Sequence, residues 1–475
     1  MARRTKIIAT VGPACEDDAT LRKMVRAGMD VARLSLAHGT RDEAAHRLEA
    51  VRRTAAEEGR VVGIMVDLPG PKIRAGSFGE KPVTLTEGST VELRIGSQGS
   101  TASILEVDYE GLLTDVEVGD RLTIGDGRAV VEIVDAGPDH LSARVAHGGQ
   151  LSGCPGLHIP ADRLSLRAPT DNDLVALERF LELGVDMVAL SFVRSADDLV
   201  RLPVDPHPQG PLVVAKIEPR AAIDDLPAII EASGAVMVAR GDLGVEISIE
   251  KVPTWQKHII LEANKRHVLV ITATQMMESM IHSPQPTRAE VSDVANAVLD
   301  GTDAVMLSAE TAVGDFPQET VQAMDRIILG AERTWQERRT DRPINDRADN
   351  IDEVIAMAAM QAANRLSNVA AIIAMTETGN TPRLMSRLRS GMPIYAFTPY
   401  PSSQRRVAIL RGVHAIPFDS HALASDTVNR QAVSMLEAMG VVQTGDRILI
   451  TKGNYDDAHG GTNTLKIVEV GGNIQ

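Results

Sequence analysis

Short apolar segments alternate with amphipathic segments along most of the chain. Eight apolar runs rich in valine, isoleucine and alanine are typical of buried parallel strands, at 6–11, 31–36, 61–67, 187–192, 212–218, 235–239, 268–274 and 304–308. Helical periodicity follows most of them, at 19–27, 42–58, 173–183, 223–232, 255–265, 288–299 and 319–331. Eight strand-then-helix units favour an α/β fold built on a closed TIM (β/α)8 barrel over an open doubly wound sheet.

Two intervals break this rhythm. Between Gly70 and about Arg167 the pattern changes to short alternating strands, at 83–85, 90–93, 116–118, 122–124, 130–134 and 141–145. They predict a small β-barrel inserted after the third barrel strand, placed to act as a lid. A charged stretch at 337–349 predicts a linker, and further strands follow at 370–375, 394–397, 448–451 and 465–470. The predicted domains are a catalytic barrel (1–70 and 168–340), an inserted all-β lid (71–167) and a C-terminal α/β domain (347–475).

Composition and charge narrow the class of protein. The 475 residues carry 49 basic and 64 acidic side chains, a formal charge of −15, which argues against nucleic acid or an anionic membrane as a partner. No apolar run is long enough for a membrane helix, and no signal peptide is expected. With only Cys15 and Cys154, no disulfide framework is implied, so we expect a cytoplasmic protein.

Polar side chains stand where the predicted barrel strands end. Lys216 and Glu218, two residues apart, leave the fifth strand on one face, and a structural salt bridge alone would explain them. However, the other strands end in polar residues too: Arg33, Ser35 and His38, then Asp67, Ser191, Asp242, Thr274 and Ser308. Because the carboxyl ends of barrel strands meet at one rim, we expect these side chains to share a site.

The residue types at this rim fit phosphoryl transfer. Glu218 and Asp242 suit Mg²⁺, which takes one or two carboxylates and completes its shell with water and phosphate oxygens. Arg33, Arg74 and Lys216 would face phosphoryl groups, whose transfer depends on positioning and charge neutralisation. No Walker A motif and no Gly-rich dinucleotide fingerprint is present, which disfavours a P-loop kinase and a Rossmann dehydrogenase.

Several segments resemble the pyruvate kinase family. They are 6–13 (KIIATVGP), 28–34 (GMDVARL), 70–74 (GPKIR), 215–218 (AKIE), 239–246 (ARGDLGVE), 273–280 (ATQMMESM), 286–298 and 306–311. The resemblance implies a glycolytic phosphotransferase that converts phosphoenolpyruvate and ADP to pyruvate and ATP. It also implies Mg²⁺, with Mn²⁺ as a substitute, and a homotetramer.

The resemblance also implies roles for the rim residues. Lys216 would neutralise the transferring phosphoryl group, Glu218 and Asp242 would hold magnesium, and Arg33 would contact phosphate. The substrate carboxylate would lie on Gly241, Asp242 and Thr274, the nucleotide phosphates near Arg74, Ser35 and His38, and the protonation step beside Thr274 and Ser308. Ordinary strand-end capping would also explain Thr274 and Ser308.

Some positions depart from the family pattern. Ser35, Ala37 and Leu68 replace an asparagine, a serine and a hydroxyl or amide residue of its potassium site, which leaves Ser35 and Asp67 as a remnant. Lys72 stands where potassium-dependent members carry glutamate, so we expect that K⁺ is not required. In the lid, Pro155 replaces a lysine that reaches the nucleotide, whereas Asp126 matches the family's lid aspartate.

A candidate effector loop lies in the C-terminal region. Its residues are Thr376, Thr378, Gly379, Asn380 and Thr381, which precede a helix and could bind a phosphometabolite. Helix capping explains them equally well. Asp456 and Asp457 in a later loop would repel a second phosphate. The alternative function is a catalytically weak, pyruvate-kinase-like metabolite sensor, for which Ser35, Ala37, Leu68 and Pro155 are the support.

Overall fold

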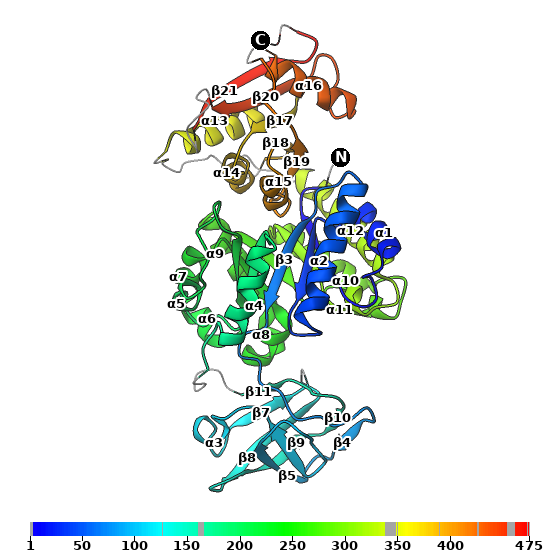
Figure 1. The fold of residues 1–475 in the computed structure, drawn as a ribbon, viewed down its shortest axis with the longest axis vertical. Coiled ribbons are helices and arrows are strands. Elements are labelled where there is room, and N and C mark those ends of the chain that lie inside the picture. Colours follow the sequence, from blue (N-terminus) through cyan, green and yellow to red (C-terminus); the bar gives the residue numbers. More distant parts are fainter. Residues whose placement is uncertain are drawn as a thin grey trace.

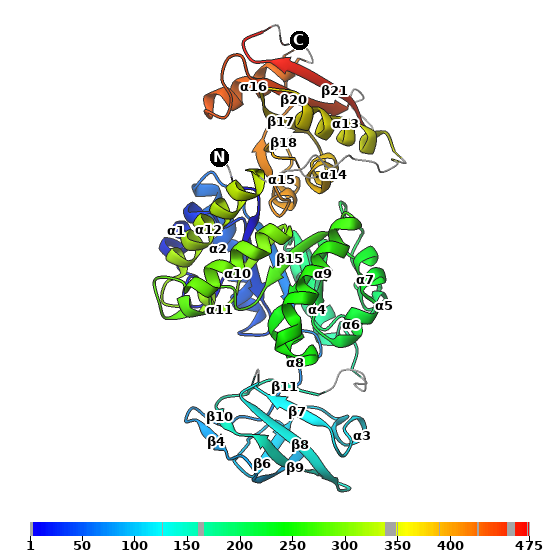
Figure 2. The ribbon, with the colours of Figure 1, turned by 180° about the vertical axis from the view of Figure 1, so that it is seen from behind.

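The protein is built from three parts stacked along its longest axis. The computed structural model describes residues 3–125, 127–159, 166–337, 348, 350–388, 390–424, 427–453, 461–472 and 474, without the side chains of 334–337. A barrel lies in the middle, an all-β part at one end and a C-terminal α/β part at the other (Figure 1, and from behind in Figure 2). No helix in the described residues is long and apolar enough to cross a membrane.

The central part is a closed ring of eight parallel strands, as the sequence predicts. The strands are β1 (Lys6–Thr10), β2 (Val31–Ser35), β3 (Gly63–Leu68), β12 (Met187–Leu190), β13 (Leu212–Ile217), β14 (Ala235–Ala239), β15 (Leu269–Ala273) and β16 (Ala304–Leu307). Each of them pairs with its neighbours in the ring, and β16 closes it on β1. The barrel fold is therefore confirmed.

Helices surround the ring. They are α1 (Asp18–Ala27), α2 (Arg41–Glu57), α4 (Asp171–Glu182), α5 (Ala196–Val200), α6 (Arg220–Asp224), α7 (Leu226–Ala232), α8 (Arg240–Ile247), α9 (Val252–Lys265), α10 (Arg288–Asp300), α11 (Ala309–Ala312) and α12 (Pro317–Glu337), with 3-10 turns η2 (Ile249–Lys251) and η3 (Glu278–Ile281). The predicted helix 223–232 is divided at Asp225 into α6 and α7. The start of α2 is fixed by a capping box in which Thr40 and Glu43 bond each other's backbone amides.

Alternate side chains along the barrel strands belong to two different hydrophobic cores, one outside and one inside the barrel. Ile7 and Ala9 of β1 face the outer helices, whereas Ile8 faces the inside of the barrel. The inner core continues without interruption into the C-terminal part, where Met360 and Met385 belong to the same cluster. The amino end of the barrel is thus closed by apolar packing, and the rim at the carboxyl ends of the strands is where an active site can form.

The inserted segment is all-β, as predicted, but its strands form two separate sheets around a common core rather than one closed β-barrel. Its strands are β4 (Val83–Leu85), β5 (Thr90–Ile95), β6 (Ile104–Val107), β7 (Arg121–Ile124), β8 (Ala129–Ala136), β9 (Leu141–His147), β10 (Gly149–Leu151) and β11 (Leu157–His158), with one short helix, α3 (Leu112–Asp115). The order is β11-β7-β8-β9-β5-β6 in one sheet and β10-β4 in the other. We call this segment the lid.

The predicted lid strand at 116–118 is wrong. Val116 is buried, but Val118 is 58% exposed, so the apparent alternation is not matched by a partner strand. The Asp120 carboxylate instead accepts the Glu117 amide at 2.8 Å, which draws the chain into a turn completed by Gly119 at φ +96°.

The C-terminal part is a five-stranded sheet with helices. It contains α13 (Ile351–Arg365), β17 (Val369–Met375), α14 (Asn380–Leu388), β18 (Ile394–Thr398), α15 (Pro401–Val407), β19 (Val413–Pro417), α16 (Val428–Ala438), β20 (Arg447–Gly453) and β21 (Thr462–Glu469). The order is β19-β18-β17-β20-β21, with β21 antiparallel to β20. Sequence reasoning missed β19, in which His414 and Pro417 interrupt the apolar run.

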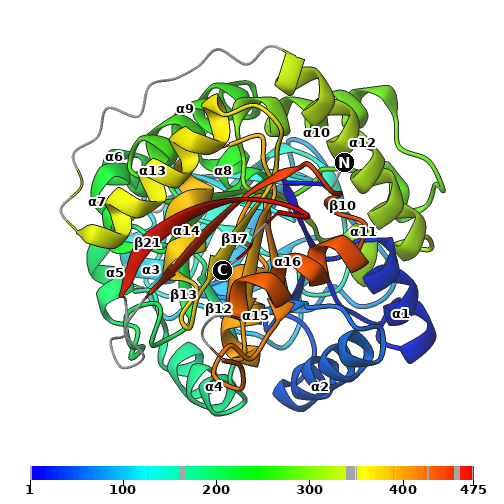
Figure 3. The same cartoon turned by 90° about the horizontal axis from the view of Figure 1, so that it is seen from above.

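Buried ion pairs fasten this C-terminal part to the amino ends of the barrel strands. The Arg387 guanidinium donates two hydrogen bonds of 2.7 Å to Asp303, just before β16. Arg405 pairs with Asp186, just before β12, at 3.0 Å. Figure 3 looks down on this end, where the C-terminal sheet lies across the barrel. The candidate effector loop is therefore at the far end of the barrel from the catalytic rim.

The substitution Arg387→Met tests this anchor. It leaves the Asp303 carboxylate buried without its bidentate partner, so we expect the free energy of unfolding to fall by about 3 kcal/mol. Thermal unfolding followed by circular dichroism measures the change. Arg430→Met, at an exposed position of α16, is the control and should leave the melting temperature unchanged. Equal melting temperatures for the two variants would contradict this role of Arg387.

Candidate active site

Lys216 lies at the centre of a polar cluster at the carboxyl ends of the barrel strands. Its ammonium nitrogen is 2.8 Å from Glu218 Oε1, donates to Ser191 Oγ at 2.7 Å and lies 3.4 Å from Asp67 Oδ1. The residue is only 8% exposed. Burial alone would lower the pKa of Lys216, but Asp67 and Glu218 outweigh burial and raise it, so the ammonium stays charged.

Asp67 holds a second cation beside this lysine. Its Oδ2 accepts the Arg33 Nε at 2.7 Å, and Arg33 Nη1 donates to Thr10 Oγ1 at 3.0 Å. Burial would raise the pKa of Asp67, whereas Arg33 and Lys216 lower it more strongly, so the carboxylate is ionised. One buried carboxylate thus positions two cations side by side, an arrangement suited to binding an anion.

Glu218 and Asp242 form an unbalanced carboxylate pair. Burial raises the pKa of Glu218, Lys216 lowers it and the nearby Asp242 raises it again, with a net upward shift. Glu218 Oε2 accepts the Phe192 amide at 2.7 Å, but Oε1 has no hydrogen-bond partner among the described residues besides its ionic contact with Lys216. A divalent cation would relieve this repulsion, so the donor set fits Mg²⁺.

The described residues contain no group of three or more His, Cys, Asp or Glu side chains that could enclose a metal ion. A cation on Glu218 and Asp242 would therefore keep most of its shell for water and ligand oxygens. That is how Mg²⁺ is held where it bridges to phosphates, and unlike the closed cage of a structural zinc site.

Helix α8 begins directly after β14 and brings its first amides to the rim. The Gly241 amide donates to Thr274 Oγ1 at 2.8 Å, so the helix start and the end of β15 are joined. Thr274 and Gln275 have positive φ angles of +65° and +52°. Arg240 holds this strained loop, because its guanidinium donates to the carbonyl of Thr274 at 2.8 Å and pairs with Asp293 at 2.7 Å.

Glu310 ties the ends of β15 and β16 together. It is 1% exposed, and its carboxylate accepts the Ser308 amide at 2.6 Å and the Met277 amide at 3.2 Å. Ser308 Oγ is buried and has no hydrogen-bond partner among the described residues. The Ser308 hydroxyl is therefore available for a ligand or a water molecule.

Basic residues gather at the mouth of the second and third strands. Burial, followed by the charges of Arg74, Lys72 and Arg33, lowers the pKa of His38. Arg74 donates to the carbonyls of Ala37 at 3.4 Å and of Cys154 at 3.3 Å, so it spans the barrel and the lid.

The remaining positions of the expected monovalent-cation site are less polar. Ser35 is half-buried and lies opposite Asp67 in the pairing of β2 and β3. Leu68 is fully buried in the apolar core and offers no side-chain oxygen. Pro155 lies in the lid, next to the strand β11, whereas Asp126 is outside the described residues.

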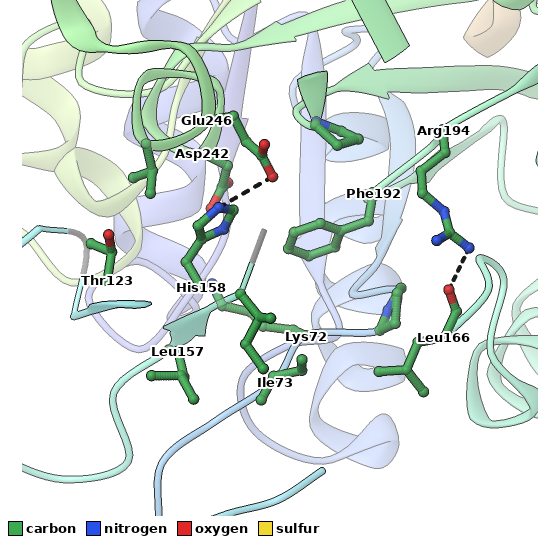
Figure 4. A pocket seen from close by; sticks show the side chains of 15 residues that line it. Lys72, Ile73, Thr123, Leu157, His158, Leu166, Phe192, Arg194, Asp242 and Glu246 are labelled. Atoms are coloured by element: carbon green, nitrogen blue, oxygen red, sulfur yellow. Dashed lines mark hydrogen bonds and ion pairs between the residues drawn. The ribbon is translucent and has the colours of Figure 1, made fainter. Parts of the chain in front are cut away.

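A pocket opens between the barrel and the lid beside Asp242 (Figure 4). Phe192, Asp242 and Glu246 line it from the barrel, and Lys72, Leu157 and His158 line it from the lid and its hinge. His158 Nε2 lies 3.2 Å from Glu246 Oε1 across this cleft. A side-chain contact from the lid thus reaches the helix that carries Asp242.

The candidate effector loop is internally satisfied. Thr376 Oγ1 accepts the Gly379 amide at 2.9 Å, Asn380 donates to Asp352 at 2.8 Å, and the hydroxyls of Thr381 and Thr462 are 2.7 Å apart. Asp456 and Asp457 fall outside the described residues. These contacts are those of a capped helix start.

Sequence reasoning placed Ser191 at the rim, but it missed Glu246 and His158 as residues of the site. Glu310 lies two residues beyond Ser308, so the strand-end rule leads to it as well. No local signal could have found the Glu246–His158 contact, because it joins residues from the barrel and the lid.

Comparison with known proteins places these features in a family. The model of the pyruvate kinase barrel domain matches residues 2–321, and that of the pyruvate kinase alpha/beta domain matches 353–468. The chain is 43% identical to pyruvate kinase II of Salmonella typhimurium, over 98% of this chain and 99% of that protein. It is 41% identical to a pyruvate kinase of Haemophilus influenzae (95% and 96% covered) and 39% identical to one of Mycobacterium tuberculosis (99% of each). The chain belongs to the pyruvate kinase family.

Proposed function

We propose that this protein transfers the phosphoryl group of phosphoenolpyruvate to ADP on the rim around Lys216, giving pyruvate and ATP. The observation that carries the proposal is the Lys216 ammonium held between Asp67, Ser191 and Glu218, with Arg33 beside it. These groups present positive charge to a phosphoryl group in transit, where neutralisation is the main catalytic requirement.

Lys216 and Arg33 would have different roles toward the phosphoryl group. Arg33 is fixed by Asp67 and would hold the phosphate of phosphoenolpyruvate. The Lys216 ammonium would neutralise the charge on the group as it leaves the enolate oxygen for the terminal phosphate of ADP. Because Asp67 and Ser191 hold that ammonium in place, little reorganisation is needed during the reaction.

Pyruvate kinases generally require Mg²⁺, and Glu218 with Asp242 would hold it here, with Mn²⁺ as a substitute. When bound, the metal supplies positive charge for the phosphoryl and substrate oxygens. Glu218 stays ionised more readily near that charge, and its Phe192 amide contact keeps the carboxylate aimed at the rim.

The carboxylate of the substrate would lie at the start of α8. The amides of Gly241 and Asp242 and the hydroxyl of Thr274 would bind it, in place of the present contact between Gly241 and Thr274. Thr274 and Ser308 would then flank the enolate carbon that takes up a proton. Glu310 is a positioning residue for this step, since it fixes the backbone of Ser308 and of the loop after Thr274.

The nucleotide phosphates would lie near Arg74, His38 and Ser35, between the barrel and the lid. Arg74 donates to the carbonyl of Ala37, which directly precedes His38, at 3.4 Å, and this contact supports the placement. With Pro155 in place of a lysine, the lid gives the nucleotide one cation fewer.

Turnover should not require K⁺. Both oxygens of Asp67 already contact cations, Leu68 offers no ligand, and the Lys72 ammonium supplies fixed charge in this region. The remnant Ser35 and Asp67 would not bind a monovalent ion tightly.

A phosphometabolite effector at the Thr376–Thr381 loop and a homotetrameric assembly remain further proposals. The loop lies at the start of α14, whose Arg387 anchors the C-terminal part to the barrel. A bound anion there would act on this helix.

Lys216→Met tests the central residue. It removes the ammonium without changing the length of the side chain much, so we expect kcat to fall by about 10³-fold or more. A coupled assay with phosphoenolpyruvate, ADP and Mg²⁺ measures it, after circular dichroism has shown that the variant is folded. Lys23→Met, at an exposed position of α1, should keep full activity. The proposal fails if the wild type shows no turnover, which is the result expected of a metabolite sensor.

Glu310→Gln tests the positioning of Ser308. The amide can accept only one of the two backbone donors well, so we expect kcat to fall about tenfold with the KM for ADP unchanged. The exposed Glu319→Gln is the control. A rise in the KM for ADP at unchanged kcat would contradict the assignment.

Potassium dependence is tested by replacing one monovalent cation with another. At constant ionic strength, we expect kcat in NaCl to stay within about twofold of kcat in KCl, because a fixed ammonium replaces the mobile ion. Activity that is lost in sodium and restored by potassium would refute the proposal.

A further inference from the structure

The lid meets the barrel through a side-chain contact that the reaction itself does not use. His158 lies in strand β11 of the lid, and Glu246 lies in helix α8 of the barrel. Their side chains are 24% and 9% exposed, and His158 Nε2 is 3.2 Å from Glu246 Oε1. Figure 4 shows the two side chains pointing toward each other across the pocket.

Glu246 connects this contact to the catalytic rim. It lies four residues after Asp242 on the same short helix, so the two carboxylates stand one turn apart on one face. Asp242 is close enough to His158 to act on the pKa of the imidazole, which burial lowers overall. His158 Nε2 lies 3.2 Å from Glu246 Oε1 and can donate an N–H to this carboxylate whether the imidazole is neutral or charged.

The backbone on the lid side is held by hydrogen bonds where the contact is made. Strand β11 pairs with β7, His158 opposite Thr123, and the Leu157 amide donates to the carbonyl of Ile73 at 3.0 Å. Ile73 belongs to the hinge that leaves the barrel after β3. A displacement of His158 is thus a displacement of the lid sheet and of its hinge, not of a loose side chain.

We propose that His158 and Glu246 form a latch that sets the position of the lid over the Asp242 end of the active site, and that His158 is a positioning residue for the nucleotide. The inference rests on the proposed function only for its kinetic part. Closing the lid brings Arg74 and Lys72, which lie on its hinge, to a fixed distance from the rim. The latch thus supplies an anchor where Pro155 provides no charged side chain.

The test is a double-mutant cycle on the full chain. In His158→Ala the lid loses the side chain that donates to Glu246. We expect the KM for ADP to rise about tenfold, because a hydrogen bond to a charged group usually contributes about this much to binding. We expect kcat to stay within about twofold of the wild-type value. Glu246→Ala should act similarly, and the double variant should be no worse than the more impaired single variant. His158→Gln, whose amide can donate to Glu246, should restore most of the loss. The exposed lid residue His147→Ala is the matched control and should match the wild type.

Hydrogen–deuterium exchange measures how the latch affects the backbone of the lid and its hinge, and it does not require catalysis. We expect faster exchange of segments 70–75 and 156–159 in His158→Ala, and wild-type exchange in His158→Gln and His147→Ala. Additive effects of the two alanine substitutions, or no change in either exchange or KM, would overturn the latch. If the wild type does not turn over at all, the proposed function fails, and the exchange result alone decides whether the latch exists.

Discussion

The active site depends on one buried charge, the ammonium of Lys216. A single ammonium in this position would be costly to desolvate, so its place in the fold is stabilised by two carboxylates, one from another strand and one just beyond its own strand. Asp67 comes from β3, and Glu218 directly follows β13, the strand that carries Lys216. Asp67 also holds Arg33 of β2. The rim is therefore a small electrostatic network, and removing any one charge would leave its partners unbalanced.

The barrel explains how distant segments reach this network. Each strand delivers its last one or two side chains to the same end, so residues separated by more than a hundred positions come together without long loops. The opposite end is closed by apolar packing and by ion pairs to the C-terminal part. The catalytic rim and the contacts that anchor the C-terminal part thus lie at opposite ends of the same strands.

Much of the fold could be predicted from the sequence, because its strands are continuous apolar runs that differ clearly from the amphipathic helices. The eight barrel strands appear where expected, whereas the lid strand at 116–118 does not, since three residues of alternation do not specify a strand. The domain limits and the assigned roles of the rim residues stay predictions. Strand-end position placed Lys216, Glu218, Asp242 and Thr274 at one rim. It could not indicate Glu246 and His158, because their contact depends on how the lid folds back over the barrel.

We infer that this network moves a phosphoryl group directly between two substrates. Phosphorus NMR of the wild-type protein with phosphoenolpyruvate, ADP and Mg²⁺ follows every phosphorus atom in one experiment. The account predicts that the phosphoenolpyruvate resonance disappears while the γ-phosphorus of ATP grows by the same amount, and that neither changes without ADP. Release of inorganic phosphate in place of ATP, or unchanged spectra with all three components present, would contradict it.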